Sequence, residues 1–320
     1  MGKKKLVITA YWPEKIVEAL QQDYQLVAPA YGETLKGERL MDALKEADAM
    51  SPLFYDKITA EFIEQLPKSL KIIAGFGIGT DHIDVTAARD RGIAVSNTPG
   101  VVTTDTADLT IGLMIATARR FYEREQDIRT NNWQALALME GLGQRVSGKT
   151  LGIIGLGAIG QAVAKRAKAF DMRVVYNSRT PKPEVEKLLN IEYLPQEQLL
   201  AEADVVSLHA ALTPDTHHMI NADAFIKMKT TAILINTGRG GLVDEKAMVT
   251  ALSEKTIMGA GLDVYEYEPK LADGLADLEN VTLLPHIGTA TVDTREAMAM
   301  RVKENLDHFF KHGQPMDPVL

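Results

Sequence analysis

The sequence of 320 residues contains no cysteine, which excludes disulfide bonds, thiolate metal ligands and a cysteine nucleophile. Long apolar runs are also missing. The longest uncharged stretches, including residues 109–118 and 150–164, fall short of the roughly 20 residues that span a membrane. Acidic residues outnumber basic ones, and the net charge of −8 disfavours binding to nucleic acid or to an anionic membrane. We therefore expect a cytoplasmic protein with neither nucleic acid nor membrane as partner.

Clusters of metal-ligand residues are scarce along the chain. His217 and His218 are adjacent in a predicted turn, and no group of ligand residues has the spacing of a zinc site. We therefore expect no metal site.

Apolar runs rich in β-branched residues alternate with amphipathic segments, which is typical of β-α-β units in a parallel sheet. A first series of predicted strands covers residues 5–9, 25–28, 49–52, 71–75 and 94–96. A second series covers residues 150–154, 173–176, 205–208, 232–235, 258–262 and 281–284. Helical patterns at 103–130 and 291–311 mark where the chain crosses between domains if the second series is inserted into the first. The pattern and length predict an α/β protein with two doubly wound parallel-sheet domains.

A glycine-rich motif follows the first strand of the second series. Its GxGxxG pattern stands between an apolar strand and a predicted helix at residues 158–170. In dinucleotide-binding folds these glycines make a tight turn, admit the pyrophosphate and let the helix pack closely on the strand. The N-terminus of the helix adds unpaired N–H groups that attract phosphate. The residues expected to bind the dinucleotide are Gly155, Leu156, Gly157, Ala158, Ile159 and Gly160.

The residues after the next strand predict which dinucleotide is bound. NAD-binding proteins carry an Asp or Glu here, which binds the 2′-hydroxyl of the ribose. This chain instead has Asn177, Ser178, Arg179 and Thr180, and its first carboxylate is Glu184. The guanidinium and the hydroxyls suit a 2′-phosphate. We expect NADPH to be preferred over NADH, and the alternative is a solvated arginine in an enzyme of mixed specificity.

Three later strands end in polar residues at the sheet edge where doubly wound folds bind ligands. Reduction of a 2-keto acid needs a group that holds the carboxylate and a donor that protonates the carbonyl oxygen. We expect Arg239 to bind the carboxylate and polarise the carbonyl. His286 is the expected proton donor, with a glutamate on its other ring nitrogen. Glu268 and Glu266 are the candidates for that glutamate, and Asp263 is expected to hold the nicotinamide carboxamide or orient the site.

Six ordered motifs resemble those of the D-isomer-specific 2-hydroxyacid dehydrogenases over essentially the whole chain. They are residues 75–84, 97–99, 155–160, 236–240, 261–269 and 285–288. The resemblance implies a Rossmann cofactor domain, residues 99–286, inserted into a flavodoxin-like substrate domain made of residues 1–98 and 287–320. It also implies a homodimer with residues 133–143 at its interface. Glu268 is favoured over Glu266, because the glutamate of the family directly precedes a proline.

The resemblance adds further residues to the expected site. Arg239, Glu268 and His286 are its catalytic set. Implied substrate contacts are Leu53, Ile78, Gly79, Arg239 and His286. Implied cofactor contacts, beyond the glycine loop and residues 177–180, are Val102, Thr106, His209, Ala210, Leu212, Pro214, Thr216, Thr237, Gly238, Arg239, Asp263, His286 and Gly288.

The sequence thus predicts an oxidoreductase that transfers hydride from NADPH to a small 2-keto acid and gives the D-2-hydroxy acid. The stretch from Asn177 to Thr180 is similar to that of NADP-dependent glyoxylate and hydroxypyruvate reductases. One alternative is a dehydrogenase for a larger aryl, branched or sugar-derived 2-keto acid, because the bulky residues at 51–55 leave the pocket size open. A second alternative is a corepressor-like protein that senses nicotinamide cofactors.

Overall fold

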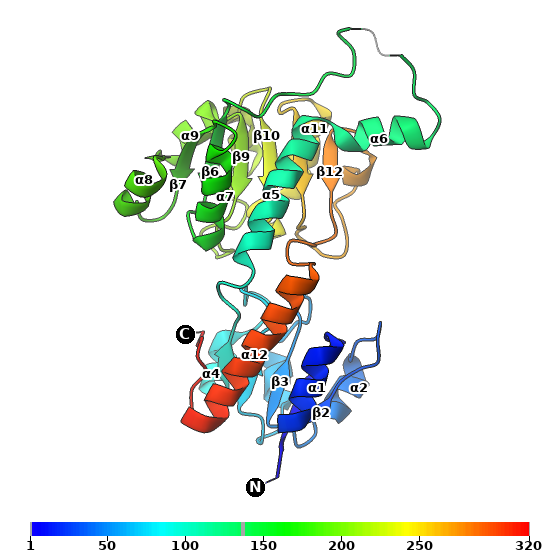
Figure 1. Ribbon diagram of the computed structural model, residues 1–320, viewed down its shortest axis with the longest axis vertical. Helices are drawn as coiled ribbons and strands as arrows, with labels where there is room; N and C mark the ends of the chain where they lie inside the picture. The colour runs from blue at the N-terminus through cyan, green and yellow to red at the C-terminus, as the bar shows by residue number, and fades with distance from the viewer. Residues whose placement is uncertain (1, 136–137, 320) are drawn as a thin grey trace. The chain divides into compact units, whose positions relative to one another are not determined.

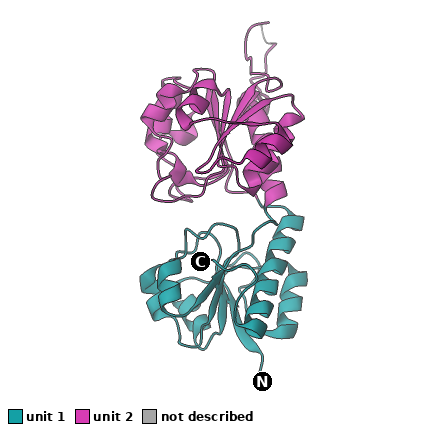
Figure 2. Cartoon of the chain, turned by 90° about the vertical axis from the view of Figure 1, so that its left-hand side faces the viewer, with its two compact units in different colours: residues 1–102, 289–320 teal, residues 103–288 magenta. Residues whose placement is uncertain are grey.

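The structure is a computed structural model that describes residues 2–135 and 138–319 (Figure 1). The chain divides into two compact units (Figure 2). Unit 1 comprises Met1–Val102 and Thr289–Leu320, and unit 2 is the single stretch Thr103–Gly288. Each unit has its own parallel sheet, so the prediction of two parallel-sheet α/β domains is confirmed. Among the described residues, no helix is both long enough and apolar enough to cross a membrane.

Unit 1 is built on a five-stranded parallel sheet. Its order, β2-β1-β3-β4-β5, is that of flavodoxin-like sheets. The strands are β1 Lys4–Ile8, β2 Tyr24–Val27, β3 Ala49–Ser51, β4 Ile72–Ala74 and β5 Ala94–Ser96. The helices between them are α1 Glu14–Asp23, α2 Gly37–Leu44, α3 Ala60–Gln65 and α4 Val85–Asp90. All five strands of the first predicted series are therefore present.

The last helix, α12 Val292–His312, returns the chain to unit 1. The Thr291 side chain caps its first turn, and Gly313 ends it in a left-handed conformation with φ of 80°. The helix packs against α1 and β4. Its apolar face is buried at Met298, Val302 and Leu306.

Unit 2 contains a seven-stranded parallel sheet in the order β12-β11-β10-β9-β6-β7-β8. Strands β6 to β11 follow the Rossmann arrangement, in which the strand order reverses between β6 and β9. The strands are β6 Thr150–Ile154, β7 Arg173–Asn177, β8 Glu192–Tyr193, β9 Val205–Leu208, β10 Ile233–Asn236, β11 Gly259–Leu262 and β12 Val281–Leu283. The two-residue β8 was not predicted, because so short a strand shows no periodicity.

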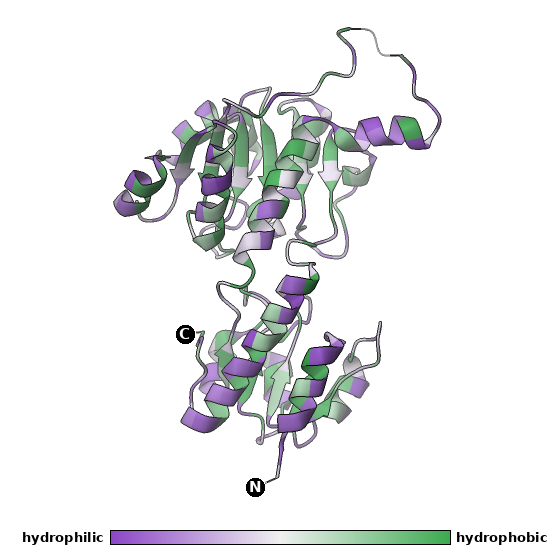
Figure 3. Cartoon of the chain, in the orientation of Figure 1, coloured by the Kyte–Doolittle hydropathy of each residue, from purple (hydrophilic) through white to green (hydrophobic). Residues whose placement is uncertain are grey.

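Both faces of this sheet are covered by helices and are apolar. Along β9, Val205 packs on one face while Val206 and Leu208 pack on the other, as the alternation of a strand requires. Figure 3 shows the strands of unit 2 as mostly hydrophobic. Between these strands lie the helices α7 Ala158–Lys168, α8 Pro183–Leu189, α9 Gln196–Glu202, α10 Ala222–Lys227 and α11 Glu245–Ser253. Two 3₁₀ turns, η1 Gly240–Leu242 and η2 Leu275–Asp277, also lie between strands.

The helical segment predicted at 103–130 consists of two helices, α5 Thr103–Ala118 and α6 Phe121–Arg129. They are separated at Arg120, whose φ of 57° is left-handed. Helix α5 is apolar on most sides because it packs against α7, β10 and β11. Helix α6 buries none of its residues, and Figure 1 shows it extending away from the sheet of unit 2.

Candidate active site

The glycine loop has the geometry that a dinucleotide requires. Gly155 has a φ of 99°, and a Cβ there would collide with the backbone of His209 and Ala210. A Cβ on Gly160 would collide with the carbonyl oxygen of Gly155. A Cβ on Gly157 would meet no atom within 4 Å, and no side chain caps the start of α7 at this residue. The loop therefore leaves open space and unpaired N–H groups for a pyrophosphate, so the nicotinamide dinucleotide fits.

The polar segment after β7 lies next to that loop. Asn177 and Ser178 are bound to the backbone: the Asn177 amide donates to the Leu194 carbonyl at 2.9 Å, and the Ser178 hydroxyl donates to the Thr180 carbonyl at 2.8 Å. Arg179 is exposed.

Sequence analysis missed one cation in this region. The Lys182 Nζ donates to the carbonyl of Leu156, inside the glycine loop, at 2.8 Å. The Lys182 backbone N–H is fixed as well, because it donates to the Tyr176 hydroxyl at 2.6 Å. The contact between Lys182 and the glycine loop depends on a long side chain that reaches back to the loop, so the spacing of residues in the sequence does not reveal it.

Arg239 follows β10 on a loop that its neighbours hold in place. The Asn236 side chain donates to the Arg239 carbonyl at 2.9 Å and accepts from the Gly238 N–H at 3.0 Å. Thr237 shares a hydrogen bond of 2.8 Å with Thr110 of α5. The half-buried Arg239 guanidinium donates to the Gly238 carbonyl at 2.9 Å. Asn236 is thus a positioning residue that sequence analysis did not single out.

His286 and Glu268 form a hydrogen-bonded pair. The His286 Nδ1 lies 2.8 Å from the Glu268 Oε2, and both side chains are largely buried. The other Glu268 oxygen accepts from the Tyr265 N–H at 3.0 Å. Glu266 points elsewhere, to His218. Of the two candidate glutamates, the structure therefore brings Glu268 to the Nδ1 of His286.

Asp263 holds the segment that carries His286. Its carboxylate accepts from the N–H of Ile287 at 2.7 Å and from that of Gly288 at 2.8 Å. Burial raises the pKa of Asp263, and the two N–H donors oppose that rise. Both oxygens thus hold the backbone of the His286 segment, and the expected contact of Asp263 with the carboxamide stays a prediction. Thr106 of α5 also contacts this segment: its hydroxyl donates to the Gly288 carbonyl at 3.3 Å.

The order of the parallel strands places these residues at one edge of the sheet. β10, β11 and β12 are neighbours in the sheet, so their carboxyl ends lie at one edge. Arg239 follows β10, Glu268 lies on the loop after β11, and His286 follows β12. The arrangement can hold an anionic carbonyl compound and protonate its oxygen.

Other predicted cofactor residues lie at or near this edge. His209 and Ala210 follow β9 against Gly155, and burial lowers the pKa of His209 to about 4. Leu212 packs on the core, and Thr216 closes its own turn by donating to the Ala211 carbonyl at 2.7 Å. Pro214 is exposed.

Four predicted residues belong to unit 1. Val102 is buried. Leu53 donates its N–H to Asp56 at 2.8 Å, Ile78 is exposed and Gly79 is partly exposed. Their roles in binding stay predictions.

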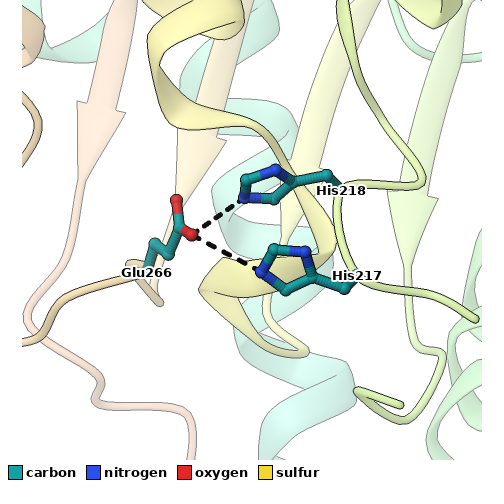
Figure 4. A group of neighbouring side chains, drawn as sticks. All are labelled: His217, His218 and Glu266. Atoms are coloured by element: carbon teal, nitrogen blue, oxygen red, sulfur yellow. Dashed lines mark hydrogen bonds and ion pairs between the residues drawn. The ribbon is translucent and has the colours of Figure 1, made fainter. Parts of the chain in front are cut away.

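His217 and His218 have an acidic neighbour that comes from another loop. Glu266 lies beside the two histidines, and the three side chains offer ligand atoms within 4.8 Å of one another (Figure 4). Because Glu266 is 48 residues beyond His218, only the tertiary fold shows this group.

Comparison with known proteins identifies the family. Residues 111–288 match the model of the D-isomer specific 2-hydroxyacid dehydrogenase, NAD binding domain. The chain belongs to this family. It is 45% identical to the glyoxylate reductase of Thermococcus litoralis over 321 residues, covering 99% of this chain and 97% of that protein. The predicted family and its oxidoreductase activity are thus confirmed.

Two solved structures have the same fold. A protein from Thermus thermophilus is 44% identical with a TM-score of 0.90, covering 99% of this chain and 100% of that one. An NADPH-dependent glyoxylate/hydroxypyruvate reductase from Sinorhizobium meliloti, solved with NADP and malonate, is 35% identical with a TM-score of 0.85, covering 99% and 97%. Unit 2 contains the NAD-binding domain of the family, and the predicted α/β fold is confirmed.

Proposed function

We propose that this dehydrogenase uses NADPH to reduce a small 2-keto acid of the glyoxylate or hydroxypyruvate type to the D-2-hydroxy acid. The observation that carries the proposal is the His286–Glu268 pair at the same sheet edge as Arg239. The names of similar proteins support the substrate class, since the Thermococcus litoralis relative is a glyoxylate reductase.

The mechanism assigns one task to each of these residues. When bound, the nicotinamide cofactor supplies the hydride that reduces the carbonyl carbon. Arg239 binds the substrate carboxylate and polarises the carbonyl through its guanidinium. His286 donates a proton from Nε2 to the carbonyl oxygen, while Glu268 on Nδ1 orients the ring and stabilises its charged form. Asp263 fixes the backbone from which the imidazole projects.

Replacement of the proton donor tests this assignment. His286→Gln should lower kcat by about a hundredfold or more, because general acid catalysis contributes 10²–10⁴-fold, and it should leave the Kd for NADPH nearly unchanged. Steady-state kinetics and a fluorescence titration of NADPH measure the two quantities. Retained turnover in this variant would remove His286 from the acid role.

A panel of 2-keto acids tests the substrate class. Oxidation of NADPH is followed at 340 nm with glyoxylate, hydroxypyruvate, pyruvate, phenylpyruvate and a branched 2-keto acid. We expect the highest kcat/KM for glyoxylate or hydroxypyruvate. A preference for the aryl or branched acids would favour a larger-substrate dehydrogenase, and failure of every acid despite NADPH binding would favour a cofactor-sensing protein.

The cofactor preference rests on two cations and a missing carboxylate. Arg179 is exposed after β7, and Lys182 binds the glycine loop. A 2′-phosphate adds about two negative charges, which these side chains attract and which an Asp or Glu would repel. We expect Arg179→Ala to raise the KM for NADPH about tenfold and to change that for NADH little. Lys187→Ala removes an exposed cation within α8 and is the matched control; a wild-type preference for NADH would contradict the proposal.

We also propose that the remaining predicted residues act in binding and assembly. Leu53, Ile78 and Gly79 of unit 1 contact the substrate, and the protein works in the cytoplasm as a homodimer. The proposed interface includes residues 133–143, of which 136–137 lie outside the described residues.

Exposed apolar side chains support this interface. Trp133 is 74% exposed, Leu138 91% and Met139 76%, which is unusual for large apolar residues and typical of a surface that another chain covers. Trp133→Glu should convert the dimer to monomer in sedimentation velocity. Leu188→Glu, at an 81% exposed position in α8, is the matched control and should stay dimeric. A monomeric wild-type protein would refute the assembly.

A further inference from the structure

His217, His218 and Glu266 converge on one point from two loops of unit 2. The histidines lie in the turn after β9, and Glu266 lies after β11. The ring Nε2 atoms face the same carboxylate oxygen, at 2.8 Å from His218 and 3.6 Å from His217 (Figure 4). The rings stack with centroids 3.9 Å apart and planes inclined by 25°. The stacking directs two nitrogens and one oxygen to the same side.

The distances between these atoms suit a tetrahedral metal ion. With bonds of about 2.0 to 2.1 Å from zinc to nitrogen or oxygen, two ligand atoms of a tetrahedral site lie about 3.3 Å apart. The observed separations of 2.8 and 3.6 Å fall on either side of that value. Because the three ligand atoms lie within 4.8 Å of one another, small rotations of the side chains bring the set into ligating geometry.

The backbone around the cluster is fixed before any ion binds. The His218 N–H donates to the Gly241 carbonyl at 2.8 Å, and the Glu266 N–H donates to the buried Glu245 carboxylate at 2.8 Å. The His217 side chain is 52% exposed and that of Glu266 only 11%. An ion thus has access from solvent on the His217 side, where water completes its coordination, and little ordering opposes its binding.

The charge of the surroundings favours a cation. Glu266 lies close to two further carboxylates, since its N–H donates to the buried Glu245 side chain at 2.8 Å and Glu268 follows two residues later. These carboxylates repel one another, so a positive ion beside Glu266 lowers the local electrostatic energy.

We propose that His217, His218 and Glu266 bind one Zn²⁺ ion, with water in the remaining position. Two imidazoles and one carboxylate select Zn²⁺ or a similar transition metal over Mg²⁺ and Ca²⁺, which take oxygen ligands. The ion links the turn of residues 213–219 to the loop that carries Glu268. Because the unfolded chain does not hold the three ligands together, the ion also stabilises the folded protein.

Calorimetric titration of Zn²⁺ into EDTA-treated, dialysed protein at pH 7.5 tests the site. We expect one ion per chain, a raised unfolding temperature in the presence of Zn²⁺, and no saturable binding of Mg²⁺. His217→Asn and Glu266→Gln should each weaken Zn²⁺ binding about tenfold or more. Binding should also weaken at pH 5.5, because protonated imidazoles do not ligate metals.

A second histidine pair provides the matched control. His308 and His312 lie on α12 with ring centroids 4.4 Å apart. Two histidines four residues apart lie on the same face of a helix and can themselves bind zinc. His308→Asn should leave the binding unchanged. The proposal is overturned if the wild-type protein shows no saturable binding up to about 100 µM Zn²⁺, a concentration far above the Kd of structural zinc sites. It is equally overturned if His217→Asn binds as the wild type does, or if His308→Asn abolishes binding.

Discussion

Asp263→Asn converts one oxygen of a buried carboxylate into an NH₂ group and should displace the segment that carries His286. Asp263 is only 1% exposed and accepts two hydrogen bonds, at 2.7 Å from Ile287 and at 2.8 Å from Gly288. An amide has a single acceptor oxygen, so one N–H loses its partner and faces another donor. Hydrogen bonds to charged groups contribute about 1.5–3 kcal/mol, while removal of the buried charge offsets part of that loss. We expect a net cost of about 2 kcal/mol.

Thermal unfolding and steady-state kinetics together measure this effect. In a domain of this size about 2 kcal/mol lowers the unfolding temperature by ~5 °C. Misplacement of the imidazole by about 1 Å should lower kcat 10- to 100-fold, with little change in the KM for NADPH. Asp273→Asn, at an exposed position before η2, is the control and should resemble the wild type. A lowered unfolding temperature with unchanged kcat would refute the positioning role of Asp263, and no change in either quantity would refute the whole argument.

Three further predictions concern the cofactor loop, acid stability and the glutamate partner. Gly157→Ala should keep the wild-type unfolding temperature but weaken NADPH binding about tenfold or more in a fluorescence titration. Gly160→Ala should lower the unfolding temperature and also weaken NADPH binding, because of these two substitutions only the Cβ at residue 160 collides with the protein. Burial lowers the pKa of His209 to about 4. Between about pH 6.5 and pH 4 the unfolded chain therefore binds more protons than the folded chain, and the free energy of unfolding falls by up to about 3 kcal/mol as the pH is lowered. In urea unfolding over this pH range, His209→Asn should lose less stability than the wild type; equal losses would contradict the reasoning. Glu268→Gln should lower kcat about 10- to 100-fold at constant KM for NADPH, since a charged hydrogen bond of about 1.5–3 kcal/mol is lost, and wild-type turnover would contradict it.

The sequence predicted correctly those features that depend on residues close together in the chain. The glycine loop needs three glycines within six residues; a Cβ on Gly155 or Gly160 would collide with the backbone, and Gly157 leaves open space. The strands were predictable because both faces of each sheet are covered, which makes their sequences continuously apolar. Strand β8 escaped prediction because its two residues carry no pattern.

Residue spacing gives no signal where long side chains or distant loops meet. Spacing alone left Glu266 and Glu268 as equal candidates; the family resemblance favoured Glu268, and the fold shows that Glu268 reaches His286 while Glu266 reaches His218. The Lys182 contact with the glycine loop has the same origin, since it depends on a side chain that reaches back across a turn.

The hydrogen bond between the Thr106 hydroxyl and the Gly288 carbonyl has a consequence for how such a protein can be rebuilt. It joins the first turn of α5 to the last residue of unit 2, so the two ends of this unit lie side by side. A module whose two ends lie side by side can be excised or exchanged at two neighbouring chain junctions, because no long linker has to span its surface. Grafting residues 103–288 of one relative into another is therefore a direct route to recombining cofactor preference with substrate choice.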